Sequence, residues 1–92
     1  MNVEVIYTTQ IKAALERASE NVEVPDGSSA VDLLQQLAAQ HGATFGELVF
    51  ADDGALLPAL IVCVGDAQLV DPAARPLAEG DVVTLLSPIS GG

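Results

Sequence analysis

One strongly amphipathic helix constrains the fold of this 92-residue chain more than any other feature. At about 100° per residue, the Ala, Val and Leu side chains of residues 30–38 fall on one side of it. Asp32 and three glutamines fall on the other side. Ser29 precedes the helix as an N-cap with Asp32 three residues later, and Gly42 is placed to end it. A single apolar stripe must be buried against a second layer, which the rest of the chain has to supply.

Strand patterns on both sides of this helix supply that layer. Apolar residues alternate with other residues at positions 3, 5 and 7 and again at 22 and 24, which predicts two strands before the helix. Residues 59–64 are continuously apolar, which is typical of a strand covered on both faces. Residues 68–70 predict a short return strand, and residues 82–87 predict a final strand that is apolar on both faces.

Two further segments are less regular. Ile11, Ala14, Leu15 and Ala18 are spaced as one face of a short helix without clear caps. Residues 43–57 are interpreted as a loose connection with a turn at Asp52-Asp53-Gly54.

The order of these elements predicts an α+β fold with a mixed sheet of four to five strands and one main helix packed on one face. Pairing the first and last strands in the middle of the sheet, with the helix across them, gives the β-grasp (ubiquitin-like) fold. A ferredoxin-like sandwich is the second choice, because it would need two long helices. We expect one domain over residues 1–87 and a flexible tail over residues 88–92.

Charge and cysteine content exclude several classes of function. Thirteen acidic residues stand against Lys12, Arg17 and Arg75, a net charge of −10, which disfavours nucleic acids and anionic membranes. The acidity indicates either protein partners with basic docking surfaces or simple solubility. Cys63 has no second cysteine to pair with, and the N-terminus lacks a secretory signal pattern, so a cytoplasmic location is expected.

Side chains that could perform catalysis are scarce. His41 is the sole imidazole, so it has no partner for a metal site or a catalytic triad, and its expected role is a favourable interaction with the end of the helix. Cys63 lies in the middle of an apolar strand and is expected to pack in the core. No glycine-rich loop precedes a helix. The sequence therefore predicts a protein that is not an enzyme on its own and binds no metal or cofactor.

The C-terminal residues are the remaining candidate for chemistry. Pro88 stiffens the exit from the final strand, and Gly91 and Gly92 have no Cβ and permit close approach inside a narrow channel. These properties suit a C-terminal carboxylate that another protein's active site must grasp, activate and release. The carboxylate of Gly92 is therefore predicted to be the working group.

Three motifs in the last third of the chain resemble the ThiS and MoaD family of β-grasp sulfur carriers. They are Val64-Gly65-Asp66, the segment from Leu77 to Val83 (LAEGDVV), and the tail from Ser87 to Gly92 (SPISGG). The helix entry VPDGSSAVDLLQQLA is also similar. The match covers essentially the whole chain, loosely in its first half.

The resemblance implies a mechanism. An E1-like enzyme uses ATP to adenylate Gly92, a sulfur donor displaces AMP, and the thiocarboxylate delivers sulfur to a downstream biosynthetic enzyme. Pro88, Ile89, Ser90 and Gly91 would insert into the partner's active site. The chain would then be a protein co-substrate, or the small subunit of a synthase such as molybdopterin synthase.

Two departures from the family pattern bear on the recipient of the sulfur. Many members have Pro-Pro and Val-Ala where this chain has Ser87-Pro88 and Ile89-Ser90, which leaves the downstream partner open. Extra residues around positions 50–57 favour carriers of the molybdopterin or cysteine-synthesis type over the shorter thiamin type.

The docking surface and two rival functions stay open at this level. Val83 and Leu86, on opposite faces of the last strand, are candidates for a docking patch, unless the segment 43–57 covers them. One rival function is a ubiquitin-like covalent modifier, for which Lys12, the sole lysine, excludes chains of several linkages. The other is a non-covalent binding module in which the Gly-Gly end is incidental.

Overall fold

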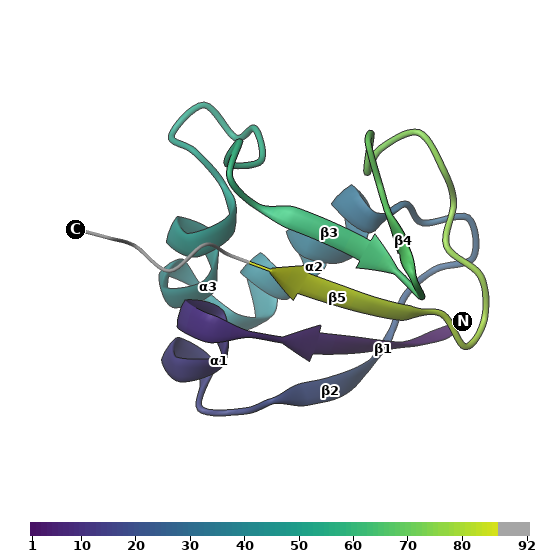
Figure 1. Cartoon of the computed structure of the whole chain (residues 1–92), viewed down its shortest axis with the longest axis horizontal. Helices are drawn as coiled ribbons and strands as arrows, with labels where there is room; N and C mark the ends of the chain where they lie inside the picture. Colours follow the sequence, from purple (N-terminus) through teal and green to yellow (C-terminus); the bar gives the residue numbers. More distant parts are fainter. Residues whose placement is uncertain (87–92) are drawn as a thin grey trace.

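A computed structural model of the chain describes residues 1–86. Its five strands form one sheet in the order β2-β1-β5-β3-β4 (Figure 1). The central pair, β1 and β5, is parallel, and the other neighbours are antiparallel. The elements in chain order are β1 (Asn2–Tyr7), α1 (Thr9–Leu15), β2 (Ser19–Glu23), α2 (Ala30–His41), α3 (Ala43–Val49), β3 (Ile61–Val64), β4 (Ala67–Gln68) and β5 (Val82–Leu86).

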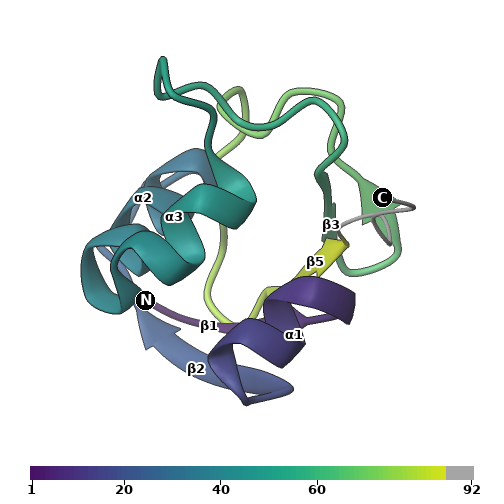
Figure 2. The same cartoon turned by 90° about the vertical axis from the view of Figure 1, so that its left-hand side faces the viewer.

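This topology confirms the β-grasp prediction. The first and last strands lie side by side in the middle of a mixed sheet, and α2 and α3 lie on one side of it (Figure 2). None of the described helices is both long enough and apolar enough to cross a membrane.

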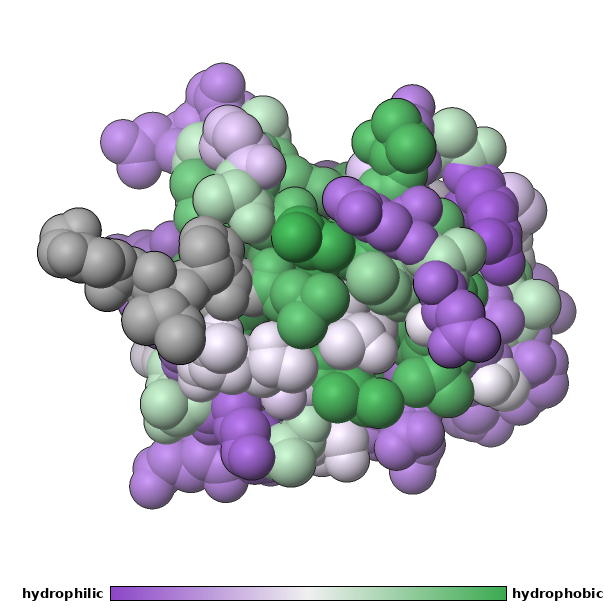
Figure 3. Space-filling model, viewed as in Figure 1, coloured by the Kyte–Doolittle hydropathy of each residue, from purple (hydrophilic) through white to green (hydrophobic). Residues whose placement is uncertain are grey.

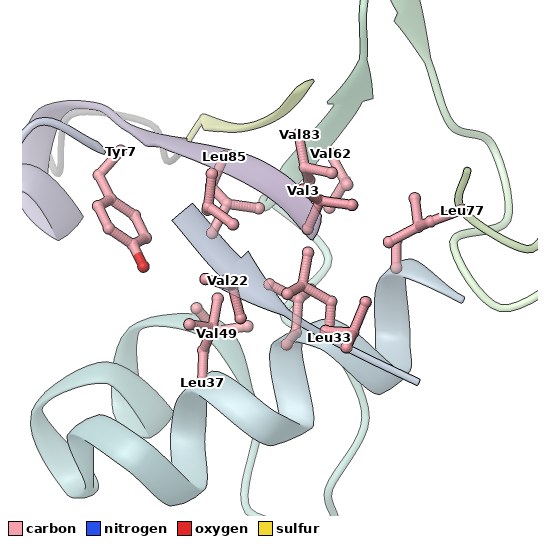
Figure 4. Packing of buried hydrophobic residues seen from close by; sticks show 14 of the residues in the cluster. Val3, Tyr7, Val22, Leu33, Leu37, Val49, Val62, Leu77, Val83 and Leu85 are labelled. Carbon is pink, nitrogen blue, oxygen red and sulfur yellow. The ribbon is translucent and has the colours of Figure 1, made fainter. Parts of the chain in front are cut away.

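The core lies between the sheet and these helices. Alternate residues of the central strands point toward α2, because successive side chains of a strand face opposite sides of the sheet (Figure 4). They are met by the apolar stripe of α2, so the predicted stripe is buried as expected. The buried residues at this interface include Val3, Val5, Tyr7, Leu33, Leu34, Leu37, Val62, Val83 and Leu85.

Local chemistry sets both ends of α2 as predicted. The Ser29 hydroxyl accepts a hydrogen bond from the Asp32 backbone N–H at 3.2 Å, and the Asp32 carboxylate accepts one from the Ser29 N–H at 2.9 Å. Together these bonds form a capping box. Gly42 ends the helix with a positive φ of 78°, which glycine adopts without strain, and its N–H donates to the Ala38 carbonyl at 2.8 Å.

The segment after α2 differs from the prediction. Residues 43–49 form a third helix, α3, rather than part of a loose connection, and Phe45 and Val49 from it are fully buried. Seven residues with two buried side chains carry too little periodicity to indicate a helix, and their helical state depends on packing against α1 and α2. The short helix α1 was predicted, and it buries Ile11.

The strand β3 is buried on one face only, so the prediction that residues 59–64 are covered on both faces is wrong, and β5 is likewise buried on one face. In β3, Val62 and Val64 are buried, while Ile61 is exposed. Cys63 is partly exposed, so it is not the core residue that its apolar neighbours suggested. The helices cover only one side of the sheet, and an apolar strand therefore turns half of its side chains to the other side.

Candidate functional site

The uncovered side of the sheet carries an apolar surface. The strand register places Ile61 beside Leu86 and Cys63 beside Thr84. Ile61 and Leu86 are large hydrophobic residues that remain 37% and 36% exposed. Apolar surface gathers at the centre of this side in the space-filling view (Figure 3). We call this surface the open face; its residues are Ile6, Ile61, Cys63, Val82, Thr84 and Leu86.

The structure separates the two residues predicted for docking. Val83 is 0% exposed and lies on the helix side, where it packs in the core. It therefore does not contribute to a docking surface, and the expectation for Val83 is corrected. Leu86 lies on the open face, and residues 43–49 do not cover it because they form α3 on the other side of the sheet.

The open face adjoins the point where the described part of the chain ends. The strands β1 and β5 are parallel, so their C-terminal ends lie at the same edge of the sheet. Leu86 is the last residue of β5. At this edge the hydroxyl of Thr8 donates a hydrogen bond to the carbonyl of Leu85 at 2.9 Å. The remaining predicted site residues, Pro88, Ile89, Ser90, Gly91 and Gly92, lie outside the described residues.

A polar cluster on the helix side ties three elements together. The Glu20 carboxylate of β2 accepts hydrogen bonds from the Tyr7 hydroxyl of β1, from Nε2 of His41 at 2.7 Å, and from Nη1 of Arg17 at 3.1 Å. We call these four residues the Glu20 network. Phe45 of α3 lies against both rings, edge-on to Tyr7 and tilted to His41. His41 thus pairs with a carboxylate in addition to lying in the last turn of α2.

The Glu20 network shifts the pKa values of two of its members. Burial opposes ionisation of Glu20, but hydrogen bonds from Tyr7 and His41 outweigh it, so the pKa of Glu20 is lowered. Burial, reinforced by the hydrogen bond to Glu20, raises the pKa of Tyr7 well above its ordinary value. We interpret the role of the Glu20 network as structural, because none of its groups is poised for nucleophilic attack. Within residues 1–86, no group of three or more His, Cys, Asp or Glu side chains could hold a metal ion.

Removing the Glu20 charge should alter the pH dependence of stability. A lowered folded-state pKa means that Glu20 contributes stability above its ordinary pKa of 4.5, and that this contribution is lost as the pH falls further. Glu20→Gln should therefore lower the free energy of unfolding by about 1–2 kcal/mol at pH 7 and by less below pH 4. Urea unfolding across a pH series measures this difference. Glu23→Gln, an exposed neighbour on β2, is the matched control and should change little.

Comparison with known proteins shows to which family this chain belongs. The model of the ThiS family matches residues 5–92. The chain belongs to the ThiS family. Its α+β sheet matches the ubiquitin-like β-grasp fold of its structural neighbours.

Solved structures that are similar to this ThiS-family chain cover almost its full length. SAMP1 of Haloferax volcanii has 24% identity and a TM-score of 0.89, with 100% of each chain covered. CysO of Mycobacterium tuberculosis has 20% identity and a TM-score of 0.69, covering 95% of this chain and 99% of its own. A structure described as the complex of subunits 1 and 2 of the molybdopterin-converting factor from Helicobacter pylori has 26% identity and a TM-score of 0.59, with 100% of each chain covered. No curated protein matches the chain.

Sequence reasoning missed most of the residues that build these features. The Glu20 network has no local signal, because Tyr7 and His41 lie 13 and 21 residues from Glu20 along the chain. Ile61 and Cys63 could have been found from alternation with Val62 and Val64, but an entirely apolar strand conceals which half faces outward.

Proposed function

We propose that this chain is a sulfur carrier whose C-terminal Gly92 carboxylate is adenylated by an E1-like enzyme and converted to a thiocarboxylate. The thiocarboxylate then donates sulfur in a biosynthesis of the molybdopterin or cysteine type. Membership of the ThiS family, over a match that runs to Gly92, is the observation that carries this proposal. The open face supports it, because an exposed apolar surface lies at the edge of the sheet where β5 ends.

The proposed chemistry assigns the catalytic work to partners. A carboxylate oxygen is a poor leaving group, so the activating enzyme first joins it to the α-phosphorus of ATP and releases pyrophosphate. A donor that supplies sulfur at the oxidation level of sulfide then attacks the acyl carbon, so the C–S bond forms as the C–O bond to the phosphate of AMP breaks, and AMP leaves with no change of oxidation state. The chain acts as a protein co-substrate in the cytoplasm, and the ATP is bound by the activating partner. Pro88, Ile89, Ser90 and Gly91 form the segment that enters the partner's active site.

Charge and apolar surface together define the partner surface in this proposal. The open face would meet an apolar patch, and the net charge of −10 would favour basic residues around that patch. The similar Helicobacter pylori structure is a complex of two subunits of a molybdopterin-converting factor. By analogy, we propose that one partner of this chain is the larger subunit of such a synthase.

An intact-mass measurement tests the proposal. After incubation with its E1-like enzyme, ATP and a sulfur donor, the chain should gain the mass difference of one sulfur replacing one oxygen. Omitting ATP should prevent the change. A carboxylate that stays unmodified, with an enzyme that charges its own known carrier under the same conditions, would contradict the proposal.

Covalent modification of proteins is the second candidate, and the similarity to a small archaeal modifier protein favours it. The activation step would be the same, with a lysine amine in place of the sulfur donor. Lys12 is the one lysine of the chain and is exposed on α1, so any chain of linked copies would use this position or the N-terminal amine. Recovery of lysine-linked adducts from cells would favour this candidate.

A further inference from the structure

Thr8 occupies a position where its side chain would ordinarily cap a helix. It is the N-cap residue of α1, with an extended backbone (φ −131°, ψ 164°). A threonine at this position normally accepts a hydrogen bond from a backbone N–H of the first turn, which stabilises the helix by about 1 kcal/mol. The Thr8 side chain makes no such capping bond.

The Thr8 hydroxyl instead reaches the last strand. It donates to the Leu85 carbonyl at 2.9 Å, across 77 residues of sequence, in a partly buried setting. Tyr7 pairs with Leu85 in the parallel register of β1 and β5, so this bond extends the contact between the two strands by one residue beyond β1. On the other side of β5, Ile61 pairs with Leu86. The end of β5 is thus held from both sides.

The backbone beside Thr8 is strained. Thr9 has a φ of 46°, in the left-handed region that β-branched residues rarely adopt. Strain of this kind costs roughly 1–3 kcal/mol and persists where the surrounding structure fixes it, often at functional positions. At the junction of β1 and α1, the Thr8 hydroxyl therefore contacts β5 instead of capping the helix, and the adjacent backbone is strained.

We infer that Thr8 is a positioning residue, which holds the end of β5 so that docking of the open face also directs Gly92 into the activating site. This inference rests on the proposed function. Leu85 adjoins Leu86 of the open face and precedes Gly92 by seven residues, so the Thr8 bond fixes the last described residues of β5 beside the surface on which the partner would dock. A misplacement of about 1 Å at a reacting centre can lower a rate about 100-fold.

Kinetics of adenylation test this role. Thr8→Val keeps the shape of the side chain and removes the hydroxyl, whereas Thr8→Ser keeps the hydroxyl. With the E1-like enzyme and ATP, Thr8→Val should lower kcat about tenfold and change the KM for the carrier less than about twofold, as expected when one hydrogen bond that positions the reacting group is lost. Thr8→Ser should restore kcat. Thr44→Val, which removes an exposed hydroxyl on α3, is the matched control and should behave as the wild type.

Hydrogen exchange on the isolated carrier gives a second readout. The amides of Leu85 and Leu86 should exchange about tenfold faster in Thr8→Val, and at the wild-type rate in Thr8→Ser, if the hydroxyl holds the end of β5. Unchanged exchange, an unchanged kcat, or a raised KM with a normal kcat would each overturn the inference alone. A wild-type chain that is never adenylated would overturn the proposed function and this inference with it.

Discussion

Deletion of Gly92 is expected to abolish thiocarboxylate formation and to leave the folded domain as stable as before. The deletion moves the terminal carboxylate back by one residue, about 3.5 Å, which is far more than an activating site tolerates at the reacting atom. The described core lies within residues 3–85, so the deletion removes nothing from it. Intact mass after the activation reaction and thermal unfolding followed by circular dichroism measure the two halves of this prediction.

Two comparisons make the deletion informative. Gly92→Ala keeps the length of the chain and adds a Cβ at the activated residue, so it should retain part of the activity if the narrow channel tolerates one methyl group. Cellular function that survives deletion of Gly92 would contradict the carrier proposal and favour the non-covalent binding module. A deletion variant with a lowered melting temperature would show that Gly92 contributes to the stability of the domain, which would contradict the second half of the prediction.

The parts of the fold that were predictable depend on local chemistry and on one long stripe. The capping box of Ser29 and Asp32 and the turn at Gly42 follow from residues only a few positions apart. The central pairing of the first and last strands was predicted together with a helix lying across them, because the stripe of α2 needs a second layer to be buried against. The helix α3 was not predictable in this way, because its two buried residues, Phe45 and Val49, gain their stability from contacts with distant elements.

The candidate site was less predictable than the fold for a related reason. Alternation along β5 told us that Val83 and Leu86 face opposite sides, but only the position of the helices decides which side is open. The contact between Thr8 and Leu85 joins residues 77 positions apart and depends on the parallel register of β1 and β5. The sequence shows no clear cap for the short helix after Thr8, and the contact of Thr8 with β5 can be recognised only in the folded structure.

Leu86→Asp is expected to weaken binding of the activating enzyme about 100-fold without unfolding the domain. Leu86 is exposed on the open face beside Ile61, so its side chain is available to a partner. Losing the burial of a leucine side chain in an interface removes roughly 1.5–3 kcal/mol, and burying an unpaired carboxylate there adds a further penalty. A total of about 3 kcal/mol corresponds to about a 100-fold increase in Kd. Isothermal titration calorimetry against the activating enzyme measures it.

Val70→Asp is the matched control for this variant. Val70 is 99% exposed and follows β4 outside the open face, so the substitution makes the same kind of change in side chain and charge at another surface position. Both variants take the net charge from −10 to −11, and any general electrostatic effect on a basic partner is therefore shared. Equal affinities for Leu86→Asp and Val70→Asp would contradict docking through the open face. A loss confined to Leu86→Asp, with wild-type thermal stability, would place the partner on the side of the sheet that the helices leave uncovered.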